Sequence, residues 1–144
     1  MKVLTLHRPW PWAIFHLPPE LGAPKLIENR SWAPPEWLVG QYLGVHAGKF
    51  FDAGAEEWIC KMLGLRQLPE QAQCIGLVGV VRVMGSYRSL AGVPIEQRRF
   101  FFGPIGWVLD SPLALKVPLP MPGKQGLWDL NEHTERAVRE ELRL

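Results

Sequence analysis

Short apolar runs, each bounded by glycine, proline or charged residues, recur along the chain and predict β-strands. The runs cover residues 3–6, 42–47, 74–84, 105–109 and 113–117. In the run at 42–47, apolar residues occupy alternate positions and would share one face of a strand. The last two runs are joined by Asp110, Ser111 and Pro112, residue types that favour a turn. We therefore expect two separate strands there.

Helical signals occur in three places. Asp52 is a good N-cap for a segment whose apolar residues recur at helical spacing until Gly64, a typical C-terminal cap. The aromatic segment 10–17 begins beside prolines suited to a first helical turn. Asn131 can cap a last helix over about 131–143. Together with the strands, these helices indicate an α+β fold: a small mixed β-barrel of five to six strands with two or three peripheral helices.

Length and composition are those of an ordinary globular protein. The 144 residues suit a single domain spanning 1–144, with 47% apolar and 21% charged residues. Cysteine occurs only at Cys60 and Cys74, which argues against a disulfide framework or a cysteine-based zinc site and fits a cytoplasmic setting. No apolar run is long enough to span a membrane. The net charge of +2 permits a polyanionic partner without requiring one.

The densest chemistry lies in residues 25–32, Lys-Leu-Ile-Glu-Asn-Arg-Ser-Trp. In a regular strand, Glu28, Arg30 and Trp32 would share one face. Buried charges are costly unless paired, so this face suits the wall of a pocket for a flat, polar ligand such as a nucleobase. The alternative is a surface ion pair beside a packed tryptophan. Strict alternation places Lys25 on the face opposite to Glu28. Lys25 and Glu28 can therefore line one pocket only if the chain bends near Ile27.

Six short motifs follow one another between residues 3 and 130. They are Leu6-His7-Arg8-Pro9-Trp10, Lys25-x-x-Glu28-Asn29-Arg30-Ser31-Trp32, Val45-His46-Ala47-Gly48-Lys49, Gly76-Leu77-Val78-Gly79-Val80-Val81, Gly106-Trp107-Val108-Leu109 and Gly126-Leu127-Trp128-x-Leu130. In this order they resemble the ASCH family. The resemblance implies a PUA-like β-barrel, partly open, with a cleft that holds the Lys–Glu–Arg segment, and a role connected with RNA or DNA.

Binding an unpaired base requires a stacking surface, hydrogen bonds to the base edge and cations for phosphate. Tryptophan could provide the stacking surface, and Glu28 could accept from an exocyclic amine. Lysine and arginine could contact phosphates or hold the carboxylate in place. The candidate binding residues are Trp10, Lys25, Glu28, Arg30, Trp32, His46 and Lys49. We expect a binding module for RNA, single-stranded nucleic acid or a modified nucleoside, with no cofactor and no membrane partner.

Enzymatic activity is the first alternative, and its candidate catalytic residues are Lys25, Glu28 and Lys49. Some ASCH proteins are amidohydrolases that deacylate N4-acylated cytidine with a lysine and a threonine three residues later. Lys25 matches that lysine, but Glu28 stands in the threonine position and cannot act as a hydroxyl nucleophile. Other family members are ribonucleases that use lysine, tyrosine and serine, for which Lys49, Tyr42 and Ser111 are counterparts by residue type.

His46 could act as a general base in RNA cleavage, because histidine exchanges protons near neutral pH. A hydrogen-bonded structural role is the alternative. The four histidines show no metal-binding spacing, so we expect no metal centre. The last alternative is an adaptor that binds other proteins through the barrel surface, and nothing in the sequence indicates an oligomeric state.

Overall fold

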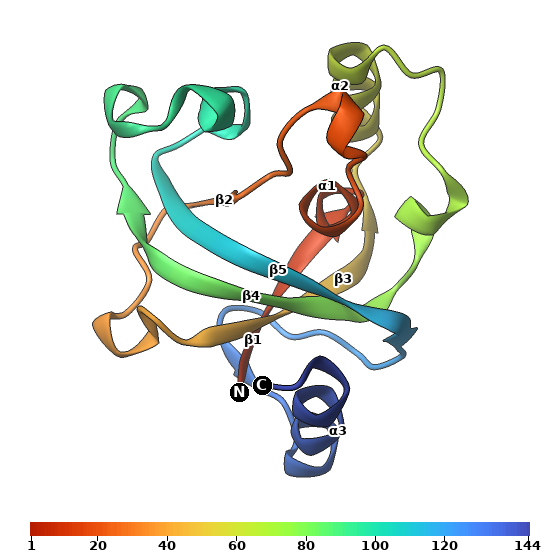
Figure 1. Cartoon of the computed structure of the whole chain (residues 1–144), viewed down its shortest axis with the longest axis vertical. Helices are drawn as coiled ribbons and strands as arrows, with labels where there is room; N and C mark the ends of the chain where they lie inside the picture. The colour runs from red at the N-terminus through yellow and green to blue at the C-terminus, as the bar shows by residue number, and fades with distance from the viewer.

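A mixed six-stranded sheet lies at the centre of the computed structural model, which describes all residues from 1 to 144 (Figure 1). The strands are β1 (Lys2–Arg8), β2 (Ile27–Arg30), β3 (Tyr42–Phe51), β4 (Gly76–Tyr87), β5 (Ile105–Leu119) and β6 (Trp128–Asp129). Their order across the sheet is β2-β5-β4-β3-β1-β6. Strands β1 and β3 are parallel, and the other neighbours are antiparallel. The α+β class is therefore confirmed, but the sheet is open, with β2 and β6 at its edges.

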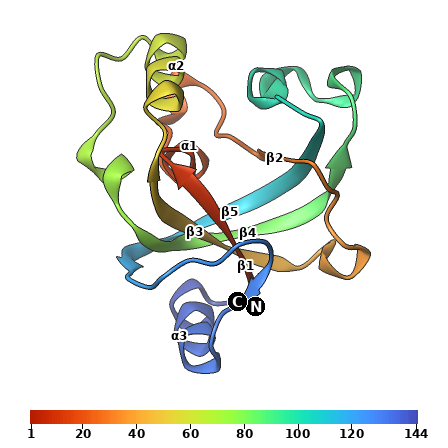
Figure 2. The ribbon, with the colours of Figure 1, turned by 180° about the vertical axis from the view of Figure 1, so that it is seen from behind.

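Three α-helices and a set of short 3-10 helices flank the sheet. The α-helices are α1 (Trp10–Phe15), α2 (Ala53–Leu63) and α3 (Glu132–Leu142). The 3-10 helices are Pro19–Leu21, Glu36–Leu38, Glu70–Gln73, Leu90–Gly92 and Ile95–Phe100. Helices α1 and α2 lie on one side of the sheet and α3 on the other (Figures 1 and 2). No α-helix is both long and apolar enough to cross a bilayer.

The capping residues predicted for the two ends of α2 and for the start of α3 are confirmed. Asp52 accepts a hydrogen bond from the backbone N–H of Ala55 at 3.0 Å, and Gly64 ends α2 in the left-handed conformation, with a φ of 69°. Asn131 accepts one from the backbone N–H of Thr134 at 2.8 Å. These local contacts satisfy backbone groups that helix ends would otherwise leave unpaired.

Three clusters of buried side chains hold the layers together. The largest covers one face of the sheet and contains Trp107, which is fully buried. A second cluster joins α1 to α2, and a third lies between the sheet and α3. On β3, the alternation predicted for 42–47 is confirmed: Leu43 belongs to the first cluster, whereas Tyr42 packs against the third.

The two strands expected at 105–109 and 113–117 are one continuous strand, β5, so that prediction is wrong. The segment between them forms a bulge instead of a turn. Asp110 pairs with Arg82 and Leu113 with Val80, so β5 has one more residue than β4 over this stretch. Ser111 adopts a φ of 50° at the bulge. Pairing to β4 continues on both sides and overrides the local turn preference.

Candidate functional site

Strand β2 carries Glu28 and Arg30 along the edge of the sheet, but it is shorter than expected. It spans Ile27–Arg30 and pairs with β5, with Glu28 opposite Trp107. Both predicted side chains line the same pocket, as their alternation implied. Trp32 lies beyond the end of β2, so the prediction that it continues the face of Glu28 and Arg30 is wrong.

Lys25 precedes β2 in an irregular segment, and this lets its side chain reach Glu28. Its Nζ atom lies 3.4 Å from Glu28 Oε1 and donates to the carbonyl oxygen of Ile27. The lysine side chain is 2% exposed. Gln97 fixes the segment from both sides of Lys25, because it donates to the Pro24 carbonyl and accepts from the Leu26 N–H, each at 2.8 Å.

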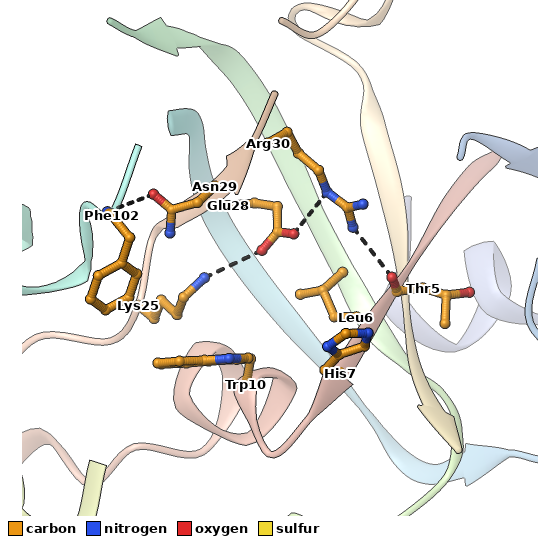
Figure 3. Close-up of a pocket in the computed structure, with 9 residues that line it drawn as sticks. All are labelled: Thr5, Leu6, His7, Trp10, Lys25, Glu28, Asn29, Arg30 and Phe102. Atoms are coloured by element: carbon orange, nitrogen blue, oxygen red, sulfur yellow. Dashed lines mark hydrogen bonds and ion pairs between the residues drawn. The ribbon is translucent and has the colours of Figure 1, made fainter. Parts of the chain in front are cut away.

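Glu28 is held between two cations, as Figure 3 shows. Arg30 Nε donates to Glu28 Oε2 at 2.9 Å, while Lys25 approaches the other carboxylate oxygen. Arg30 Nη2 donates a hydrogen bond to the backbone carbonyl of Thr5 on β1, at 3.3 Å. The side chain of Glu28 is 13% exposed and that of Arg30 24%. The row of charges is therefore fixed in place and still open to solvent at one side.

A hollow of about 260 Å³, which we call the charged pocket, opens beside this row. The Trp10 ring of α1 lies across the hollow, with Lys25 Nζ 5.4 Å from its ring centre (Figure 3). Phe102 stands next to it, with 5.8 Å between the two ring centres. Asn29 Oδ1 accepts from the Phe102 N–H at 2.8 Å and so holds that loop. Aromatic faces and a fixed carboxylate thus share one small space.

Burial lowers the pKa of the Lys25 amine below its usual range. The charge of Glu28 and its hydrogen bond to the amine oppose this shift, and the Arg30 guanidinium adds to it. An amine with a lowered pKa is more readily deprotonated at neutral pH and can then accept a proton or act as a nucleophile. Sequence spacing alone gave no sign of this burial, because it depends on α1 and on the segment around Gln97.

A larger hollow of about 680 Å³, which we call the adjacent groove, adjoins the charged pocket. The two share Thr5, His7 and Arg30 in their linings. Lys49 and Trp32 line the groove and not the charged pocket, so the structure divides the predicted binding residues between two adjoining hollows. The reason is that Trp32 packs against Trp107, with 4.8 Å between ring centres, and β3 carries Lys49 to the far side of β1.

His46 is 2% exposed, and protein groups occupy both of its ring nitrogens. Its Nδ1 atom lies 3.2 Å from Thr5 Oγ1, and its Nε2 atom lies 2.8 Å from the carbonyl oxygen of Met121. Trp128 Nε1 donates to the same Thr5 hydroxyl at 3.1 Å. This network ties the 120–127 loop to β1 and β3, which favours the structural role for His46.

The residues matched to the ribonuclease pattern do not come together. Tyr42 and Ser111 line neither the charged pocket nor the adjacent groove, whereas Lys49 lines the groove. Phe102 and Gln97 contribute to the site but were missed by sequence reasoning. Both lie in a segment without regular periodicity, and only the fold brings that segment to β2.

The sequence was also compared with known proteins. No protein-family model and no curated protein matches it.

Proposed function

We propose that the charged pocket binds a single unpaired nucleobase, either within RNA or as a modified nucleoside. The observation that carries the proposal is the carboxylate of Glu28, fixed between Lys25 and Arg30 opposite the ring of Trp10. A planar ring can stack on an indole while its edge bonds to the carboxylate and the cations. The volume of about 260 Å³ lies just under the roughly 300–1,000 Å³ of sites for drug-sized ligands, and this suits one base.

Membership of the ASCH family and a PUA-like barrel are part of this proposal. The motif residues Lys25, Glu28 and Arg30 converge on one pocket, although strict alternation along a strand would have separated the first from the other two. The mixed six-stranded sheet also supports the proposal, since a partly open barrel is such a sheet bent toward closure.

The chemistry of the pocket favours bases that carry an exocyclic amine. Glu28 is an acceptor, so it suits the amine of cytosine, adenine or guanine, whereas uracil presents a carbonyl at the position where cytosine has its amine. A hydrogen bond to a charged group contributes about 1.5–3 kcal/mol, which corresponds to roughly tenfold or more in affinity. The proposed specificity is therefore for amino bases over uracil.

Nucleoside titrations followed by the indole N–H signals in ¹⁵N NMR spectra test this. We expect cytidine to shift the Trp10 signal, and to bind roughly tenfold more tightly than uridine because only cytidine donates to Glu28. Trp37 serves as the internal control, because it is 58% exposed and lines neither hollow. A Trp10 signal that no nucleoside moves at millimolar concentration would refute the pocket, and equal affinity for uridine would refute the role of Glu28.

Hydrolysis of an acylated nucleobase is a second candidate, favoured by the buried amine of Lys25. In that reaction a water molecule attacks the acyl carbonyl and Lys25 Nζ accepts its proton. Lys25 then returns this proton to the leaving nitrogen as the bond between acyl carbon and nitrogen breaks, which releases the free acid and the amino base. The only hydroxyl lining the charged pocket belongs to Thr5, which is bonded to Trp128 and lies beside His46. Water is therefore the oxygen nucleophile that this pocket allows.

Release of acetate from N4-acetylcytidine measures this activity directly. If the protein is a hydrolase, Lys25→Met should reduce the rate by roughly a hundredfold or more, the usual contribution of a general base. Lys61→Met is the matched control, since Lys61 is an exposed lysine of α2 paired with Glu57. Wild-type protein without acetate release, or a Lys25→Met variant as active as the control, would eliminate the hydrolase.

A further inference from the structure

We propose that the adjacent groove binds the phosphodiester backbone next to the base held in the charged pocket, so that the ligand is a single-stranded polynucleotide and not a free nucleoside. This inference rests on the proposed function of the charged pocket. It concerns separate residues, however, chiefly Lys49, Lys124 and Trp32, which line the groove alone.

The two hollows are continuous at a shared wall. Thr5, His7 and Arg30 line both of them, so a ligand that leaves the charged pocket past Arg30 enters the groove directly. The groove is also the larger hollow, about 680 Å³ against about 260 Å³. The arrangement matches a chain of nucleotides, in which the small pocket would hold one base and the larger groove the sugar–phosphate backbone attached to it.

Charge distinguishes the groove from the charged pocket. Arg30, Lys49 and Lys124 are among its 14 lining residues, and none of the 14 is an aspartate or glutamate. The chain as a whole is nearly balanced, with 16 basic and 14 acidic residues, so an acid-free groove with three cations is a local concentration of positive charge. Such a groove favours a ligand with repeated negative charges, and phosphodiesters provide them.

The wall that carries Lys124 is fixed before any ligand arrives. The backbone carbonyl oxygen of Met121 accepts a hydrogen bond from His46 Nε2 at 2.8 Å, which anchors the start of the loop. At Gly123 an added Cβ would lie 2.6 Å from Thr5 Oγ1 and 2.8 Å from His46 Nδ1, so the loop backbone sits directly on β1 and β3. A preformed wall lowers the ordering cost of binding.

Trp32 adds an aromatic surface to the same groove. Its ring is half-buried and is held edge-on by Trp107, at 4.8 Å and an interplanar angle of 88°. Aromatic rings next to cations are the usual means of holding single strands, because every base has a face that can stack. A base in a duplex is already stacked and paired, and would have to leave its helix to enter the charged pocket. The groove and pocket together therefore select single strands.

The test compares cytidine with a ten-nucleotide single-stranded RNA that contains cytidine, on wild-type protein and on the double variant Lys49→Met/Lys124→Met. We expect the RNA to bind at least tenfold more tightly than cytidine at low salt, and the double variant to lose roughly tenfold of the RNA affinity while cytidine binding stays unchanged. The slope of log affinity against log salt concentration should fall by about 1.4, since two phosphate contacts are lost on a single strand. Fluorescence anisotropy of end-labelled RNA and NMR titration of cytidine provide the two affinities.

Lys61→Met/Lys116→Met is the matched control, with the same change in net charge at two exposed lysines outside both hollows. The inference is overturned if the RNA binds no more tightly than cytidine, if its duplex form binds as well, or if the control loses as much affinity as the groove variant. These results can be distinguished from a failure of the proposed function. If the charged pocket does not bind a base, cytidine will not shift the Trp10 signal in the NMR titration. A single-stranded DNA of the same sequence is measured in the same way. If it binds as tightly as the RNA, the protein recognises the backbone phosphates and not the 2′-hydroxyls.

Discussion

Replacement of Trp107 by alanine should lower the free energy of unfolding by about 4 kcal/mol, the typical cost of removing a large aromatic side chain from a core. Trp107 is fully buried in the largest core cluster. Its Nε1 atom also donates to the backbone carbonyl of Trp32 at 2.7 Å, so the substitution leaves that carbonyl without its partner. Urea unfolding followed by far-ultraviolet circular dichroism measures the change through the shift in midpoint.

The same variant should weaken the site, because Trp107 lies opposite Glu28 in the β2–β5 ladder. Trp37→Ala is the matched control: this indole is 58% exposed, and its loss should change the free energy of unfolding by no more than about 0.5 kcal/mol. If the two substitutions had similar effects on the unfolding midpoint, the central role assigned to Trp107 in the core would be wrong.

Glu28→Gln should destabilise the protein by about 3 kcal/mol at pH 7, because it leaves the buried Lys25 ammonium without its counter-charge. The pKa of Lys25 is already lowered by burial, and Glu28 is the group that opposes this shift. Without the carboxylate, the pKa should fall further. The NMR signal of the Lys25 ¹³Cε carbon, followed against pH, reports this change.

The pH dependence identifies the cause of the loss. The folded protein holds the Lys25 proton less tightly than the unfolded chain, in which a lysine has a pKa of about 10.4. Between the two pKa values the unfolded state binds more protons, so stability rises with pH. The variant has the lower folded pKa, so its deficit should shrink as the pH rises from the folded pKa of Lys25 in the variant to that in the wild type, which is itself below the unfolded value. A deficit that is constant across this range would mean that Lys25 is not its source.

Glu57→Gln provides the comparison for a solvent-exposed pair. Glu57 lies 3.2 Å from Lys61 on α2, and the two side chains are 70% and 78% exposed. Exposed pairs contribute little to stability, so this substitution should change the free energy of unfolding by about 0.5 kcal/mol or less. The contrast between Glu28 and Glu57 separates the effect of burial from the loss of a negative charge.

Sequence reasoning succeeded where the deciding interactions are local. Helix α2 begins after Asp52 and ends before Gly64 as predicted, because both caps act within one helical turn. Glu28 and Arg30 share a pocket because alternation along a strand depends only on neighbouring residues.

Sequence reasoning failed where distant segments decide. The side chain of Lys25 turns toward Glu28 in a segment that is held by Gln97, more than 70 residues further along the chain. Phe102 reaches the charged pocket through its hydrogen bond to Asn29. Lys49 and Trp32 line the groove and not the pocket because of how β1, β3 and β5 are arranged. No short-range pattern carries that information.

The bulge at Ser111 marks a place where the length of β5 can change. Deletion of Ser111 would remove the extra residue of this stretch, while the pairs Asp110–Arg82 and Leu113–Val80 on either side would be kept. Leu115, which is 5% exposed in the cluster beneath α3, would therefore keep its face. Deletion of Ala114 would instead place Leu115 opposite Gly79, on the face that Ala114 now occupies. The segment between β4 and β5 consists of short 3-10 helices outside the sheet, and a residue gained or lost there leaves the strand register intact. Deletions should therefore be tolerated in that connection and at Ser111, and rejected at Ala114.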